Sequence, residues 1–165
     1  MKKTALLIVF SCFLFNCKQN DTQVDRLEMQ IKALEQKLEN VYTPGFGTLM
    51  GHIQTQHSKL WFSGINKNWE LAEFNLHEIQ ERFEDIEKYR ADKKEVQFVP
   101  MIEPVMDSLK NDIREKNFVK FEKNFLLLTN TCNSCHKLTK HDYIEIKIPD
   151  MELNFNQVFT PKNRN

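Results

Sequence analysis

The chain has 165 residues, of which 28% are charged and 41% are hydrophobic. This length is typical of a single domain, and the composition excludes a disordered polyelectrolyte. The 23 basic residues balance the 23 acidic ones, so no net charge draws the protein to nucleic acid. Only four Gly and five Pro are present. That leaves few turns for a many-stranded β protein and favours an all-α fold.

The N-terminal residues 1–16 are typical of a signal peptide. Lys2 and Lys3 precede an apolar run from Ala5 to Phe15, which is too short to span a bilayer, since a spanning helix needs about 20 residues. The run ends at Leu14-Phe15-Asn16-Cys17, which resembles the lipobox of bacterial lipoproteins. We therefore expect an exported protein that is anchored to a bacterial envelope membrane by a lipid on Cys17. An ordinary signal peptide, cut nearby, is the alternative.

Residues 17–43 form a linker that contains a short heptad pattern. Its apolar residues are spaced alternately by three and four positions, as in the seam of a coiled coil; they are Val24, Leu27, Ile31, Leu34, Leu38 and Val41. One interpretation is a stalk that forms a homo-oligomer through Val24–Val41. The other is a solvated helix that lies against its own domain.

Residues 44–142 contain four further amphipathic patterns. Thr43-Pro44 predicts the start of the first helix and Ser63-Gly64 its end, because Thr is a good N-cap, Pro suits the first helical position and Gly follows many helices. The second helix starts at Trp69, the third at Pro100 or Pro104, and the fourth after Asn117. The polar stretch 90–97 predicts a loop.

The four apolar faces predict a four-helix bundle, because such helices joined by short loops bury their stripes against one another. The residues expected to face inward include Met50, Ile53, His57 and Leu60; Ala72, Leu76, Ile79 and Ile86; Ile102, Val105, Met106, Leu109 and Ile113; and Phe118, Phe121, Phe125 and Leu128. Residues 143–165 predict an extended tail that packs on the bundle.

The fourth helix runs into Cys132-Asn133-Ser134-Cys135-His136, and C-x-x-C-H is the pattern of c-type haem attachment. Two thiols at this spacing can form thioethers with the two vinyl groups of one porphyrin, and the adjacent His is then the proximal iron ligand. Cys132 and Cys135 also continue the apolar stripe of the helix. We expect one covalent haem c.

Other uses of the two cysteines fit less well. A thioredoxin-like CxxC lies in a βαβ pattern, which is not found here. A structural zinc site needs four ligands, and the other cysteines, Cys12 and Cys17, belong to the N-terminal signal. A lone disulfide leaves His136 unexplained.

With this motif on its last helix, the chain resembles the class II c-type cytochromes, which are the cytochrome c prime group and its low-spin relatives. The resemblance covers about Pro44 to His141, and the stretches 57–64 and 68–72 also resemble an exported mono-haem subfamily. It implies that the first helix faces the distal side of the haem. In low-spin members a Met of that helix ligates the iron, and Met50 stands at the matching place. His57 is a second candidate, and an empty sixth site is the third.

These observations predict a membrane-anchored mono-haem cytochrome that transfers single electrons to and from redox partner proteins of the envelope. We expect no substrate turnover, because the carboxylates of the second helix follow its solvated face. The alternatives are a five-coordinate gas-binding protein for NO or CO, and a tethered interaction module in which the haem is structural. Of the remaining residues, Trp61 and Trp69 are expected to pack, and His52, His77 and His141 to lie at the surface or at helix ends.

Overall fold

The structure, a computed structural model, describes residues 18–41, 44–151 and 156–162. Cys17 and the expected cleavage site lie outside these residues. The chain divides into two units, residues 1–43 and residues 44–165. Helices and irregular segments, without strands, make up the described residues. No helix among them is both long and apolar enough to cross a membrane.

The first unit contains helix α2, Lys18–Val41. The described residues of its apolar seam are each at least half exposed to solvent; they are Val24, Leu27, Ile31, Leu34 and Leu38. The β-branched residues at 24 and 31 alternate with leucines at 27 and 34, a pattern that favours two parallel strands in a coiled coil. Self-association through this seam stays a prediction.

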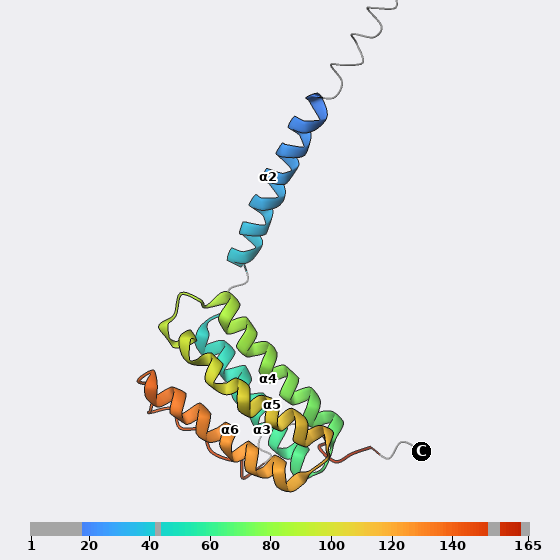
Figure 1. Ribbon diagram of the computed structural model, residues 1–165, viewed down its shortest axis with the longest axis vertical. Helices are drawn as coiled ribbons and strands as arrows, with labels where there is room; N and C mark the ends of the chain where they lie inside the picture. The colour runs from blue at the N-terminus through green and yellow to red at the C-terminus, as the bar shows by residue number, and fades with distance from the viewer. Residues whose placement is uncertain (1–17, 42–43, 152–155, 163–165) are drawn as a thin grey trace, which may run out of the picture. The chain divides into compact units, whose positions relative to one another are not determined.

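The second unit is a bundle of four α-helices (Figure 1), as the sequence predicts. Helix α3 spans Phe46–Ile65 and α4 spans Trp69–Tyr89. A 3₁₀ helix, η1, covers Lys94–Ile102; α5 spans Glu103–Arg114 and α6 spans Phe118–Leu138. Each helix packs against the next, and α3 also contacts α6, so the ring is closed.

The core of the bundle confirms the predicted apolar stripes. The buried residues come from all four helices and from η1, and Phe121, Phe125, Leu60, Ala72, Ile86 and Leu109 have no accessible surface. They form one cluster together with Leu49, Ile53, Leu76, Ile79, Val99, Ile102, Val105, Met106, Ile113 and Leu128. Trp61 and Trp69 pack against this cluster, as expected.

Two predicted boundaries are wrong. Helix α3 begins at Phe46 with Gly45 as its N-cap, so Pro44 precedes the helix, and the amides of Thr48 and Leu49 both bond the Gly45 carbonyl. The expected loop at 90–97 becomes η1 from Lys94 onward. Its apolar residues at 96, 99 and 102 are three positions apart, which matches the three residues per turn of a 3₁₀ helix.

The α3–α4 and α5–α6 connections use the same tight corner. Lys67 and Lys116 adopt left-handed backbone conformations, with φ of 55° and 53°. The following residues, Asn68 and Asn117, each donate their amide to the carbonyl five positions earlier, at 2.9 Å. Each Asn side chain then caps the next helix by accepting a hydrogen bond from the amide three positions later. One Asn therefore ends one helix and begins the next.

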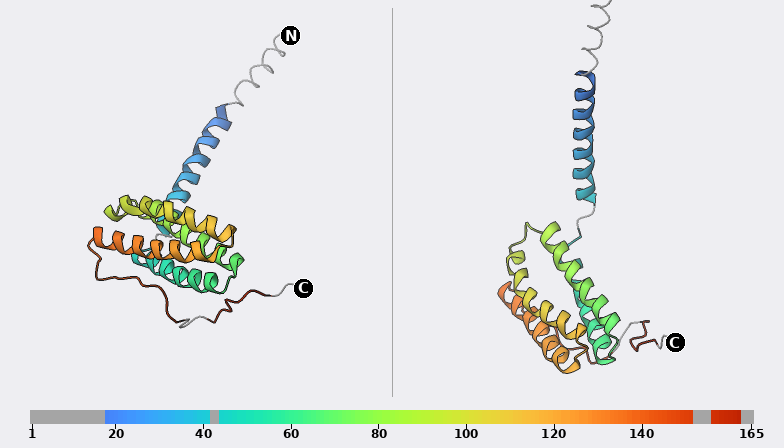
Figure 2. Two further views of the ribbon diagram at one scale, coloured as in Figure 1. Left: turned by 60° about the horizontal axis from the view of Figure 1, so that its bottom comes forward. Right: turned by 45° about the vertical axis from the view of Figure 1, so that its right-hand side comes forward.

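After α6 the chain turns back along the bundle (Figure 2). Ile148 packs against the core cluster. Further along, Phe159 is buried, and its ring centroid lies 5.5 Å from that of Phe62 on α3. The tail therefore contacts the bundle in at least two places.

Gly64 lets α3 and α6 approach closely. A Cβ at this position would overlap Cε1 and Cζ of Phe121 and lie 2.8 Å from Cδ1, and the ring has no free surface into which it could move. We expect Gly64→Ala to lower the free energy of unfolding by about 1–3 kcal/mol, as overpacked cores do. The measurement is the midpoint of chemical denaturation.

Gly51 provides the control, because it lies in the same helix and a Cβ there meets nothing within 4 Å. Gly51→Ala should be neutral or stabilise the protein by up to about 1 kcal/mol through helix propensity. Equal stabilisation by the two substitutions would contradict the close-approach role of Gly64.

Candidate functional site

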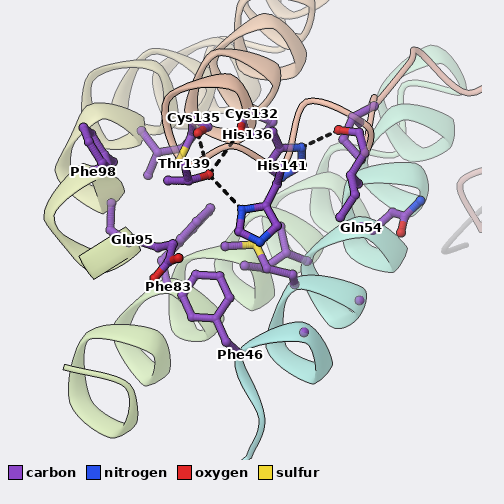
Figure 3. Close-up of a pocket in the computed structure, with 18 of the residues that line it drawn as sticks. Phe46, Gln54, Phe83, Glu95, Phe98, Cys132, Cys135, His136, Thr139 and His141 are labelled. Atoms are coloured by element: carbon purple, nitrogen blue, oxygen red, sulfur yellow. Dashed lines mark hydrogen bonds between the residues drawn. The ribbon is translucent and has the colours of Figure 1, made fainter. Parts of the chain in front are cut away.

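A cavity of about 520 Å³ lies at the end of the bundle opposite the two corners. This volume is within the range of small-molecule and cofactor pockets. The walls come from the first half of α3, the end of α4, η1, the last turns of α6 and the tail (Figure 3). Most of the lining is apolar and includes Phe46, Ile53, Phe83, Phe98 and Ile146.

The cavity brings together the candidate residues that the sequence predicts within this unit. Cys132, Cys135 and His136 line it from α6, and Met50 and His57 line it from α3. The motif and both candidates for the opposite side of an iron therefore share one space. The sixth predicted residue, Cys17, lies outside the described part of the chain.

Both cysteines of the motif are free thiols. Burial raises the pKa of Cys132 to about 12. Burial also raises the pKa of Cys135, and the nearby Glu95 carboxylate contributes in the same direction. The two groups are therefore neutral at pH 7. In dithiols that exchange disulfides, the environment lowers the pKa of a thiol. The environment of Cys132 and Cys135 raises the pKa of both thiols, which is the opposite effect.

His136 is held in one tautomer by the tail. Its Nδ1 lies 2.7 Å from the carbonyl oxygen of Ile144. Because a carbonyl only accepts, Nδ1 carries the hydrogen and Nε2 keeps its lone pair. Histidines that ligate metals usually donate their second nitrogen in this way, which orients the ring and raises its basicity.

His57 is a buried histidine with its hydrogen bond made inside the bundle. Its Nε2 lies 2.9 Å from the hydroxyl oxygen of Thr129, which itself donates to the Phe125 carbonyl at 3.0 Å. The hydroxyl therefore accepts from Nε2–H. Burial lowers the pKa of His57 to about 4, so the ring is neutral at pH 7.

The pairing of His57 with Thr129 sets the register between α3 and α6. Met50 lies two helical turns before His57, and His136 lies two turns after Thr129. Because the helices are antiparallel and rise equally per residue, Met50 and His136 come to the same level of the bundle. His57 lies about 10 Å from that level along the helix axis, at 1.5 Å per residue.

His141 lies just past the end of α6, in line with the expectation of a helix-end residue, and it also lines the cavity. Figure 3 shows its ring projecting into the pocket, with Nδ1 3.3 Å from the Thr139 hydroxyl. The cause is a third left-handed residue, Lys140 with φ of 63°, which turns the chain back after α6. Apolar periodicity gives no sign of this turn. The ring is held by this long hydrogen bond and by a tilted contact with the exposed Tyr143 ring, so rotation of the side chain can clear the space.

Among residues 18–41, 44–151 and 156–162, no group of three or more His, Cys, Asp or Glu side chains converges as a metal site does. Comparisons with models of known protein families, with curated proteins and with solved structures found no match to this chain.

The pKa of His57 predicts how stability depends on pH. The unfolded chain binds a proton near pH 6.5 and the folded chain only near pH 4. Acidification through this window therefore favours the unfolded state, by up to roughly 3 kcal/mol, and this contribution is regained as the pH rises. Denaturation midpoints of the wild type should fall more steeply between pH 6.5 and 4 than those of His57→Gln, which keeps an N–H for Thr129. Parallel profiles would show that His57 is not buried in the neutral form.

Proposed function

We propose that this chain is a mono-haem c-type cytochrome that transfers single electrons between redox partner proteins and does not turn over a substrate. The observation that carries the proposal is the convergence of Cys132, Cys135 and His136 on one apolar cavity, with Nδ1 of His136 already bonded to the tail.

The residues around the cavity fit a covalently held haem. Both thiols border the same space, so one porphyrin edge can meet both of them. Nε2 of His136 keeps its lone pair for an iron, because the other nitrogen is used. The apolar walls exclude water, which lowers the cost of rearranging solvent when the charge of a redox centre changes. The haem would supply the one-electron change, and the chain would supply position, axial ligands and a dry environment.

Met50 is the favoured sixth ligand. It is half-buried, lines the cavity and lies level with His136 across the bundle. His57 is less suited, because ligation through Nε2 would break its bond to Thr129. A thioether and an imidazole together hold iron in cytochromes that carry electrons, and a Met ligand raises their potential. If neither Met50 nor His57 ligates, the sixth site is left for a gas such as NO or CO.

The first unit supports the membrane part of the proposal. Residues 1–17 have the pattern of a lipoprotein signal, and α2 begins directly after Cys17. We place the protein in the envelope of a bacterial cell, with a lipid on Cys17 and with α2 as a linker that can associate with a second copy.

Intact mass and absorption spectra test whether the chain binds haem covalently and which residue is the sixth ligand. After denaturation and acid-acetone extraction, the purified chain should carry the mass of one haem in addition to the polypeptide and the lipid on Cys17. The oxidised protein should be low-spin and show the weak long-wavelength band of a Met–iron bond. This band should disappear in Met50→Ala and remain in His57→Gln and in His141→Ala, because the last two residues are not expected to bind iron.

A colourless chain, or haem that extracts freely, would overturn the proposal. A high-spin wild type that binds carbon monoxide without displacing a ligand would replace the carrier with the gas-binding alternative. A low-spin wild type without the Met–iron band, which becomes high-spin in His57→Gln but not in Met50→Ala, would transfer the ligand role from Met50 to His57.

Lipidation is tested separately. Cys17→Ser should move the protein from the membrane fraction to the soluble exported fraction, since a lipid chain supplies the membrane affinity. Thr22→Ser, which changes a hydroxyl residue of α2 conservatively, should stay with the membrane. A soluble wild type that begins at a residue other than Cys17 would contradict lipidation.

A further inference from the structure

The residue between the two cysteines that touches the tail is Asn133. Its side-chain amide donates to the Ile146 carbonyl at 2.8 Å, and its carbonyl oxygen accepts from the Ile146 amide, also at 2.8 Å. One side chain thus pairs with both backbone groups of one residue, as a neighbouring strand would. The pair fixes which tail residue lies opposite α6.

This pairing also determines where the Ile144 carbonyl points. The carbonyls of Ile144 and Ile146, two residues apart, both accept hydrogen bonds from side chains of α6 and therefore both face this helix. His136 lies one turn after Asn133 along the helix, and its Nδ1 reaches the Ile144 carbonyl at 2.7 Å. A slip of the tail by one residue would turn that carbonyl away.

The tail segment is anchored on both sides of this contact. Before it, the amide of Ile144 bonds the His141 carbonyl at 2.8 Å, and the amide of His141 bonds the His136 carbonyl at 2.7 Å. After it, Ile148 packs against the core. The side chains of Ile144 and Ile146 meanwhile line the cavity. The segment is therefore both a wall of the cavity and the source of the acceptor for His136.

We infer that Asn133 is a positioning residue, which holds tail residues 144–146 in register so that the Ile144 carbonyl fixes the ring of His136. The inference rests on the proposed function, because it assigns His136 to an iron. Its consequence is electronic as well as geometric. An imidazole that donates to a carbonyl is a stronger electron donor to a metal, so Asn133 lowers the potential of the site by keeping this bond in place.

The experiment compares Asn133→Ala with Ser134→Ala in the full-length, haem-loaded protein. Ser134 is the other residue between the cysteines, and its hydroxyl bonds only the Asn130 carbonyl, within α6. In Asn133→Ala the reduction potential should rise and the Ile146 amide should exchange with solvent about tenfold faster, since two hydrogen bonds are lost. Ser134→Ala should change neither. Asn133→Ser, which is neutral and polar but too short to make both hydrogen bonds to Ile146, should behave like Asn133→Ala.

The outcomes separate the inference from the proposed function. A chain without covalent haem overturns the proposed function and this inference with it. A haem-loaded Asn133→Ala protein whose potential equals that of Ser134→Ala overturns the inference alone, even if the Ile146 amide exchanges faster. If Asn133→Ala does not fold, Asn133→Ser decides, and a wild-type potential in that variant also overturns the inference.

Discussion

The contact between α3 and α6 is the constraint on which the rest of the site depends. At one end, Gly64 has no side chain, and the ring of Phe121 fills the space that a Cβ would take. In the middle, the Trp61 and Phe125 rings pack with centroids 4.9 Å apart, and His57 bonds Thr129. Because these contacts fix both the distance and the register, they also decide which residues face the cysteine motif at the other end.

The buried pair of His57 and Thr129 costs desolvation energy but also makes the contact between α3 and α6 more specific. A buried imidazole is costly unless its N–H is paired. The Thr129 hydroxyl accepts from the ring and donates its own hydrogen bond to the Phe125 carbonyl of its helix. Apolar packing tolerates some substitution and repacking, whereas a buried hydrogen bond needs its donor and acceptor at one distance and orientation. The His57–Thr129 pair therefore gives the helix pair a specificity that Phe and Leu packing alone would not supply.

The sequence predicts the helices and most of the core because these depend on local periodicity. The stripe from Phe118 to Leu128 is visible in the spacing alone, and so is its continuation into Cys132 and Cys135. The contacts that arise from tertiary structure are not visible in this way. The pairing of Asn133 with Ile146 and the entry of His141 into the cavity both depend on the left-handed turn at Lys140, a position where Gly is the usual sequence signal. Likewise, η1 replaces a predicted loop because Val96, Val99 and Ile102, which are three positions apart, pack in or against the core. This spacing resembles neither an α-helix nor a strand pattern.

The two Lys-Asn corners have a further consequence for how the bundle opens. They close the end of the bundle where α3 meets α4 and α5 meets α6. At this end the helices are capped, and the core beside the corners is buried. The opposite end is closed by a 3₁₀ helix and by a tail held through a few hydrogen bonds. The free energy of local opening is lower where a segment makes few buried contacts, and such a segment can open without unfolding of the rest of the protein. The entry of a large planar group would then be governed by the detachment of the tail or of η1. The other half of the bundle would meanwhile keep α3 and α6 in register.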